Sequence, residues 1–358
     1  MGWYIFFGLF GLVNIIPFIA FSVKHKTDNT KDDDIFSRVN TSIYKGFAII
    51  CVVLCHYMGY YGDGVVLFTP FGGIGVSIFL LLSGFGLNES WNCKKIKTNS
   101  SNTEIHPYSY WWRKRIISVI IPYSIIQFCF YWIPLWVKNG FELSDLVPMF
   151  LDFLCIFPKY SMGWYLQYLM LWYIIFYCIR RISFLNNYRF VVFLIIGILL
   201  FFCLQVIRAE QAFSFPLGVI LSDNKKSKYV TKSYELKYGF IYIIIGICFL
   251  ALKQLSIIRS GPDNIYKMIQ LGIKLPIGFG CMILIWYISK KIDLAFFSYV
   301  GVVSYEVYII HGNVFGYFSK SIYGSFLFLL FTAIISTVYW YIMSKSKKIQ
   351  KKILRINE

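Results

Sequence analysis

The sequence has few charged residues. Asp, Glu, Lys and Arg make up 15% of its 358 residues, whereas 58% are hydrophobic and 20% are aromatic. Soluble domains carry about 25% charged residues, so the composition excludes an ordinary soluble protein. Acidic residues are the scarcer kind, with 17 against 35 Lys and Arg. The net charge of +18 would favour a nucleic-acid partner in a soluble protein, but here the cations lie between apolar runs.

Several catalytic and redox signatures are also missing. The chain has no CxxC pair, no GxSxG motif and no visible internal repeat. Its nine cysteines are an odd number, and eight of them lie in apolar segments, where cysteine packs as a small hydrophobic residue. These eight are Cys51, Cys55, Cys129, Cys155, Cys178, Cys203, Cys248 and Cys281. We therefore assign no disulfide and no metal.

Long apolar runs are what the chain does contain. Runs of roughly 20 residues recur along its length, as a helix needs to cross about 30 Å of hydrocarbon. They predict an all-α fold, a polytopic transmembrane helical bundle of about 10–11 spans. The first run lacks a basic region and a small-residue cleavage site, which favours a retained helix over a signal peptide. The candidate spans are 3–23, 45–61, 70–89, 116–136, 163–180, 190–207, 213–222, 237–253, 268–287, 295–312 and 324–344.

Lys and Arg are divided unevenly between alternate connections. One set of connections holds 27 of the 35, which leaves 8 for the rest of the chain. The richer set consists of 24–45, 90–115, 180–189, 224–237, 288–294 and the C-terminal tail. Because cytoplasmic loops carry the excess of positive charge, we predict an external N-terminus and a cytoplasmic C-terminus.

The same pattern predicts three parts of the chain. Residues 1–40 form an extra transmembrane helix with a cytoplasmic linker, residues 41–345 form the membrane domain, and residues 346–358 form a basic cytoplasmic tail. The Lys-, Ile- and Tyr-rich composition suits a bacterial plasma membrane.

Two acidic residues and two histidines lie inside apolar stretches, where polar groups are costly and usually mark a pathway or a site. The acidic residues are Asp152 and Glu306, and the histidines are His56 and His311. His56 follows the cytoplasmic Lys45 by eleven residues, which is roughly 16 Å of helix. We therefore expect His56 near or beyond the membrane midplane.

His311 comes near the external end of its predicted span. Ser304, Tyr308 and His311 are spaced four and three residues apart and share one helical face. A lone intramembrane histidine can also serve as interhelical glue, worth about 1 kcal/mol, and a partnered Glu306 can simply lock two helices. These residues by themselves leave both readings open.

A cationic cluster lies at the predicted cytoplasmic mouth of 116–136. Arg113, Lys114 and Arg115 follow Trp111 and Trp112. Positive-inside residues beside an aromatic belt look like this in many membrane proteins. The functional alternative is a funnel for a phosphate-bearing cytosolic ligand, because the guanidinium fork of Arg suits phosphate.

Taken together, four segments resemble the acyltransferase-3 family of integral membrane acyltransferases. They are "IYKGFAIICVVLCH" (43–56), "GGIGVSIFLLLSGFGL" (72–87), "RKRIISVIIPY" (113–123) and "GVVSYEVYIIHG" (301–312), with a weaker match in "SMGWYLQYLMLWY" (161–173). Each motif is short, but their order and spacing extend over most of the chain. Two positions depart from the family pattern: Lys45 stands where Arg is common, and Ser118 where a second Arg is expected.

The resemblance implies a transmembrane O-acyltransferase that takes an acetyl group from cytosolic acetyl-CoA. The acceptor is implied to be a carbohydrate hydroxyl of a surface or capsular polysaccharide, or of its glycolipid precursor, on the external side. Membrane lipids are the other expected partners, with no nucleic acid. The implied catalytic residues are His56, His311, Tyr308, Ser304 and Glu306, with His56 as general base or acyl-carrying nucleophile. The implied donor-binding residues are Arg113, Lys114, Arg115, Lys45, Ser83 and Trp164.

Two other functions are weighed against this one. A polysaccharide polymerase would be expected to have a large external loop with arginines, but the longest external loop, 137–162, has only Lys138 and Lys159. A proton-coupled transporter or flippase for glycan precursors would favour inverted repeats and more buried carboxylates, and the sequence shows neither.

Overall fold

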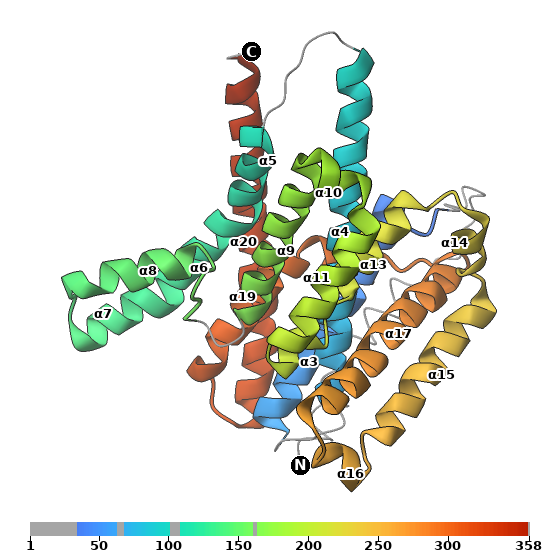
Figure 1. Ribbon diagram of the computed structural model, residues 1–358. Helices are drawn as coiled ribbons and strands as arrows, with labels where there is room; N and C mark the ends of the chain where they lie inside the picture. The colour runs from blue at the N-terminus through green and yellow to red at the C-terminus, as the bar shows by residue number, and fades with distance from the viewer. Residues whose placement is uncertain (1–33, 63–67, 101–107, 160–162, 357–358) are drawn as a thin grey trace. The chain divides into compact units, whose positions relative to one another are not determined.

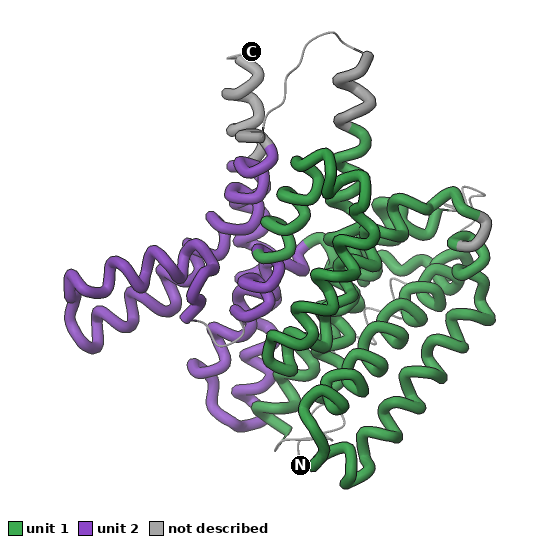
Figure 2. Tube along the Cα trace, viewed as in Figure 1, with its two compact units in different colours: residues 1–102, 171–302 green, residues 103–170, 303–358 purple. Residues whose placement is uncertain are grey.

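The computed structural model describes residues 34–62, 68–100, 108–159 and 163–356, and every regular element within these ranges is helical (Figure 1). The all-α prediction is confirmed. The predicted span 3–23 lies outside the described residues. The chain forms two compact units, each built from two separate stretches (Figure 2). Unit 1 comprises residues 1–102 and 171–302, and unit 2 comprises residues 103–170 and 303–358.

Unit 1 contains most of the helices. Its elements are α3 (Arg38–Tyr61), α4 (Thr69–Ser100), the second part of α9 (Trp164–Arg181), α10 (Ser183–Asn187), α11 (Arg189–Cys203), α12 (Val206–Ala209), α13 (Ser214–Asp223), α14 (Lys228–Lys232), α15 (Leu236–Leu252), α16 (Ser256–Arg259), α17 (Asp263–Ser289) and α18 (Ala295–Val302). Within it, α3 packs on α4 and α18, α13 packs on α4, and α15 packs on α17.

Unit 2 begins with one long, irregular helix. Its elements are α5 (Tyr108–Arg115), the π-helical turn η3 (Ile116–Ile120), α6 (Ile121–Gln127), the π-helical turn η4 (Phe128–Trp132), α7 (Ile133–Asn139), the 3₁₀ turn η5 (Leu143–Asp145), α8 (Leu146–Phe153), the start of α9, α19 (Ser304–Val314), the 3₁₀ turn η6 (Phe315–Tyr317) and α20 (Ile322–Ile356). The basic tail predicted from residue 346 continues α20 without a break until Ile356.

Among the described residues, five helical segments are long and apolar enough to cross a membrane. They are Arg38–Tyr61, Thr69–Cys93, Trp111–Asn139, Asp263–Ser289 and Ile322–Ser346. The chain is therefore a multi-pass membrane protein. Other predicted spans coincide with α9, α11, α13 and α15, each shorter than the roughly 20 residues that a perpendicular crossing needs. The number of crossings stays a prediction.

Gly84, in the segment "SGFGL", and Gly218 on α13 allow two helix backbones to touch. A Cβ at Gly84 on α4 would overlap the carbonyl oxygen of Phe215, and a Cβ at Gly218 on α13 would overlap that of Leu81. Small residues permit such approaches between membrane helices. This contact explains why an apolar span is interrupted by glycine, and it fixes α13 on α4.

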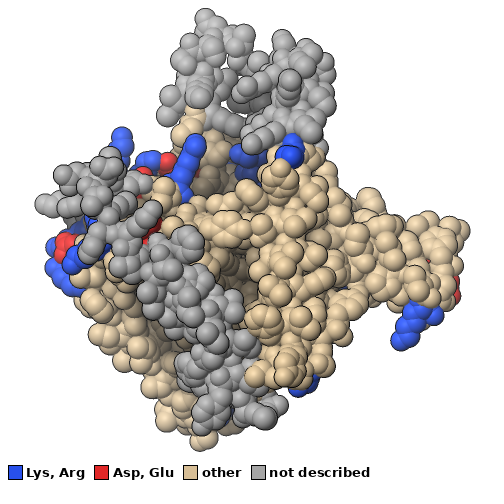
Figure 3. Space-filling model, turned by 180° about the vertical axis from the view of Figure 1, so that it is seen from behind, with Lys and Arg blue, Asp and Glu red and all other residues tan. Residues whose placement is uncertain are grey.

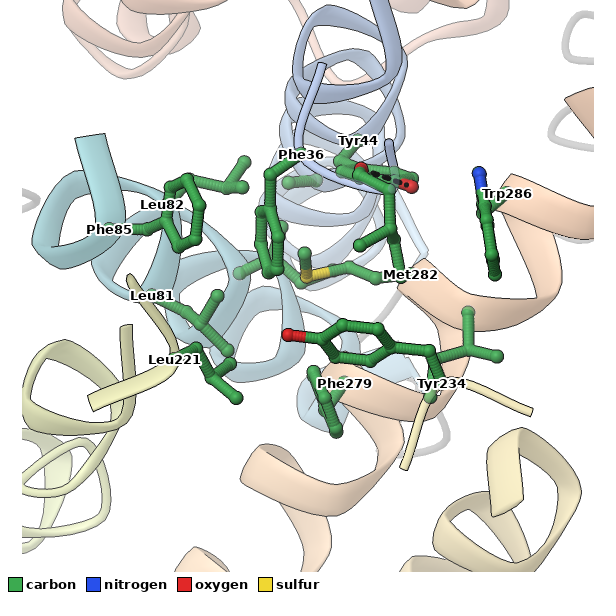
Figure 4. Close-up of a cluster of buried hydrophobic side chains, with 14 of the residues drawn as sticks. Phe36, Tyr44, Leu81, Leu82, Phe85, Leu221, Tyr234, Phe279, Met282 and Trp286 are labelled. Carbon is green, nitrogen blue, oxygen red and sulfur yellow. Dashed lines mark hydrogen bonds between the residues drawn. The ribbon is translucent and has the colours of Figure 1, made fainter. Parts of the chain in front are cut away.

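An aromatic core occupies one half of unit 1. Phe36 stacks on Phe85 at a ring distance of 3.9 Å. The Tyr44 hydroxyl donates to the Ile35 carbonyl at 3.0 Å. Met282 on α17 is fully buried in the same cluster (Figure 4). These residues come from the turn before α3, the first half of α3, the second half of α4 and the second half of α17, so the core lies toward one end of unit 1.

Three of the predicted cytoplasmic connections meet at that end of unit 1. Asn88 donates to the Asp223 carboxylate at 2.8 Å, and Arg189 pairs with the same carboxylate at 2.6 Å. Glu89 pairs with Lys225. The segments after α4, α9 and α13 therefore share one side, as their Lys and Arg content predicts. Which compartment this side faces remains a prediction.

In unit 2, backbone carbonyls in the π-helical turns of the first helix accept hydrogen bonds from other elements. Pro134 has no N–H to bond the carbonyl of Phe130, four residues earlier, and that carbonyl instead accepts from the Tyr317 hydroxyl at 3.5 Å. In the first π-turn, the Val119 carbonyl accepts from the Tyr305 hydroxyl at 2.6 Å. The helix is thereby held against α19 and η6.

Candidate active site

His56 lies in the last turns of α3, five residues before the helix ends at Tyr61. Its side chain is half-buried, and Tyr57 and Met58 beside it are buried. Gly59 shares the His56 face of the helix, three residues on. A Cβ at Gly59 would meet no described heavy atom within 4 Å. The structure thus places His56 in the half of α3 away from Lys45, with the exposed Gly59 one turn further along.

The polar face of α19 is in unit 2. His311 is fully buried, and its Nδ1 lies 2.9 Å from the carbonyl oxygen of Val307. Because a carbonyl only accepts, Nδ1 carries the proton, and Nε2 holds the lone pair in the neutral ring. The Tyr308 ring lies 5.8 Å from His311 and 5.0 Å from Tyr165 on α9. This packing fixes the orientation of an imidazole whose Nε2 can act as a base or acceptor.

The predicted span 295–312 is two helices. α18 ends at Val302, and α19 begins at Ser304 after a break at Val303. The prediction of one continuous helix is wrong here, because an apolar run does not show where the hydrogen-bond ladder stops. Ser304 and Glu306 lie in the first turn of α19, and both side chains are buried.

Asp152 is held by hydrogen bonds within unit 2. Its carboxylate accepts from the Tyr123 hydroxyl at 2.8 Å, the Trp132 indole at 2.9 Å and the Lys159 backbone N–H at 3.0 Å. Gln127 adds a longer contact at 3.4 Å. A carboxylate with this many donors is compensated for burial. Asp152 therefore fastens α8 to the long helix.

A third buried carboxylate, in addition to Asp152 and Glu306, was not predicted. Glu210, which follows α12, forms an ion pair with Lys274 on α17, and the two side chains are 5% and 8% exposed. The Lys274 side chain lies across Gly73, where any Cβ would overlap it. Gln211 donates to the Gly73 carbonyl at 2.9 Å. Unit 1 thus has an intramembrane ion pair that packs against the first turns of α4.

This ion pair borders the helix that bears His56. A Cβ at Gly72, next to Gly73, would stand 2.9 Å from the Sγ of Cys55. The polar network continues along α4, where Ser77 and Ser214 hydroxyls lie 2.9 Å apart and Ser214 donates to Gln211. The half of unit 1 that contains this network is therefore polar inside, whereas its other half holds the aromatic core.

The cations predicted to bind the acyl donor lie in α5, at the start of unit 2. Arg113 and Lys114 are exposed, and Arg115 is half-buried. The Arg115 guanidinium lies 5.0 Å from the ring centre of Trp111, a distance at which a cation is attracted to the ring face. The indole orients one guanidinium of the three cations.

Comparison with known proteins decides the family. Residues 42–345 match the family described as Acyltransferase domain, the acyltransferase-3 family. The chain belongs to the acyltransferase-3 family. No curated protein and no solved structure matches it.

Membership of the acyltransferase-3 family makes the protein a membrane acyltransferase. Of the remaining donor-binding residues predicted from the resemblance, Lys45 is exposed on α3, Ser83 is half-buried on α4, and Trp164 is half-buried at the start of α9. Among the described residues, no three His, Cys, Asp and Glu side chains are grouped as a metal site requires.

The ion pair is the part of this acyltransferase that sequence reasoning missed. Lys274 lies inside the predicted apolar span 268–287, and a cation within a span indicates a buried polar site. Glu210 gave no such signal, because it follows the predicted span 190–207 in what reads as a short external connection. A cation within a span should prompt a search for its partner among the connections.

Proposed function

We propose that this protein is a transmembrane O-acyltransferase that moves an acetyl group from cytosolic acetyl-CoA to a carbohydrate hydroxyl on the external side. The acceptor is a surface or capsular polysaccharide or its precursor, and the protein resides in a bacterial plasma membrane. The observation that carries the proposal is the family match over residues 42–345. The chemistry needs a base within the membrane domain, and His56 on α3 is the residue that the motif places there.

The proposed reaction uses His56 as general base. Its imidazole takes the proton of the acceptor hydroxyl as the oxygen attacks the thioester carbonyl. The carbon–sulfur bond then breaks, and the imidazolium returns the proton to the departing thiolate, which releases coenzyme A as the thiol. Histidine suits this role because its ordinary pKa is close to neutral pH. The Ser304 and Tyr308 hydroxyls on α19 are proposed to stabilise the developing oxyanion, and His311 is proposed to orient the reacting groups through its Nε2 acceptor.

Two measurements test the function. The purified protein should consume acetyl-CoA when a carbohydrate acceptor is supplied, and NMR of surface polysaccharide should show O-acetyl signals that are lost in a strain without the gene. A glycan polymerase or a transporter would consume no thioester. Intact thioester in the presence of several surface glycans would overturn the proposal.

Arg115→Ala should raise the apparent KM for acetyl-CoA more than the KM for the acceptor. The reason is the loss of the oriented guanidinium that the proposal assigns to coenzyme A phosphates. Arg115→Lys should rescue only part of the effect, because an ammonium lacks the bidentate fork. Initial rates at varied donor concentration give the measurement. The matched control is Arg259→Ala, which removes an exposed arginine on α16. An unchanged donor KM in Arg115→Ala would contradict the proposal and mean that Arg115 only contributes to the positive charge of the cytoplasmic side.

Sidedness provides a separate prediction. Cys93, exposed on α4, should escape a membrane-impermeant thiol reagent in intact cells and react once the membrane is permeabilised. Gly316→Cys, on the connection before α20, should react in intact cells; a Cβ there meets no described atom within 4 Å. Mass spectrometry of the labelled peptides identifies each site, with Cys93→Ser as blank. Rapid external labelling of Cys93 would invert the orientation and place the donor cluster outside the cytosol.

A further inference from the structure

The predicted external loop 137–162 is largely helical and apolar. We call residues 133–157, which include α7, η5 and α8, the apolar hairpin. Its two helices lie side by side and extend away from the rest of unit 2 (Figures 1 and 2). Large hydrophobic side chains on it are exposed: Val137 by 83%, Leu143 by 77%, Val147 by 67% and Phe150 by 61%. A contiguous apolar surface of this kind marks an interaction site.

Charge is confined to the tip of the hairpin. Lys138, Glu142 and Asp145 lie around the turn between α7 and α8, and Trp136 donates to Asp145 at 2.9 Å. The one other acidic residue of the hairpin is Asp152, which is fully buried. The exposed surface is accordingly apolar along most of the stem, with charged side chains toward the outer part (Figure 3).

The hairpin is too short to cross a bilayer. α8 has eight residues, or about 12 Å of helix, against a hydrocarbon core of about 30 Å. Its length suits a single leaflet. Its root lies where Phe130 contacts Tyr317, with ring centres 6.3 Å apart. Tyr317 belongs to the connection between α19 and α20, which the Lys and Arg distribution places on the external side.

The root is also rigid. Asp152 at the end of α8 accepts from Tyr123 and Trp132 of the long helix, and Gln127 of the same helix accepts from Asn313 at 3.0 Å. These bonds tie the base of the hairpin to α19. These bonds fix the direction in which the hairpin extends from unit 2. Its apolar side chains therefore stay exposed.

We propose that the apolar hairpin is inserted in the outer leaflet of the bilayer, with its stem among lipid acyl chains and its charged tip among headgroups. The partner is phospholipid. Apolar faces on short helices bind the headgroup–acyl boundary in this way, and charged side chains near the end of an apolar segment reach out to the headgroups. The inference concerns membrane contact and does not depend on the acyl-transfer reaction.

Photocrosslinking in the full-length protein tests the proposal. We would place p-benzoylphenylalanine at Val147, reconstitute the protein in phosphatidylethanolamine–phosphatidylglycerol vesicles and irradiate. The expected product is a phospholipid adduct of the monomer, identified by mass. The control is the same residue at Lys138, which should give far less acyl-chain adduct. A crosslinked dimer, or an internal crosslink to residues 3–23, would overturn the proposal by showing a second copy or the first apolar segment on this surface.

Thiol accessibility tests it independently. Val147→Cys and Phe150→Cys should react with a charged, impermeant maleimide at least about tenfold more slowly than Lys138→Cys, because an apolar environment suppresses the thiolate. The unsubstituted chain gives the blank for the native cysteines. Rates at Val147 and Phe150 equal to that at Lys138 in intact vesicles would show an aqueous loop and reject the proposal.

Discussion

His56→Ala should lower the rate of acyl transfer about 10²–10⁴-fold, the usual cost of losing a general base, while the protein still inserts in the membrane. The substitution removes one half-buried imidazole near the end of α3 and leaves the buried Tyr57 and Met58 in place. Initial rates of acetyl-CoA consumption by purified protein, at saturating donor and acceptor, give the measurement.

His106→Ala is the control for the loss of a histidine, because it lies in the connection 90–115 and has no role in the proposal. Its rate should equal that of the unsubstituted protein. Near-normal turnover in His56→Ala, with normal expression, would show that His56 is not the general base and has only a structural role between helices. A lost rate together with lost expression would instead call for His56→Gln, which keeps most of the side-chain volume.

Lys274→Met should destabilise the folded protein by about 3–5 kcal/mol, the cost of leaving one partner of a buried ion pair alone. The Glu210 carboxylate, 5% exposed, would keep its burial and lose its cation. Thermal unfolding in detergent, followed by loss of monomer on size-exclusion chromatography, gives the measurement. We expect the single variant to unfold well below the unsubstituted protein.

The double variant Lys274→Met/Glu210→Gln should recover most of that stability, because replacing both ions removes the uncompensated charge. Lys267→Met is the matched control on the same helix: Lys267 is also buried, but its ammonium only donates to the Phe202 carbonyl at 3.4 Å. Its loss should cost about 1 kcal/mol. A single Lys274 variant as stable as the Lys267 variant, or a double variant as unstable as the single one, would contradict the importance of the pair.

Sequence reasoning was strongest where the signal is local. Hydropathy is a property of consecutive residues, so the apolar runs led to the helices that contain His56 and Gly84. The motif ending at His311 also came from adjacent residues, and the family match confirms the resemblance it helped to carry. Local charge counts likewise grouped the connections after α4, α9 and α13, which the ion pairs of Glu89 and Arg189 bring to one side.

Local signals failed where a helix ends or bends. The run 295–312 is apolar throughout, yet the backbone breaks at Val303. The stretch 137–162 contains Gly140 and several polar residues and reads as a loop, yet most of it folds as a hairpin. In both cases packing against other elements, including the hydrogen bonds to Asp152 and Tyr305, selects the backbone.

The sequence by itself determined the class of this protein: an all-helical membrane acyltransferase with histidines inside its helices. Only the tertiary structure decided which charges are buried together. Glu210 and Lys274 are far apart in the chain, and neither residue's neighbours show that the other lies beside it. Coulomb attraction depends on the distance in space and on burial, and both are set when α17 packs against α4 and places Lys274 across Gly73.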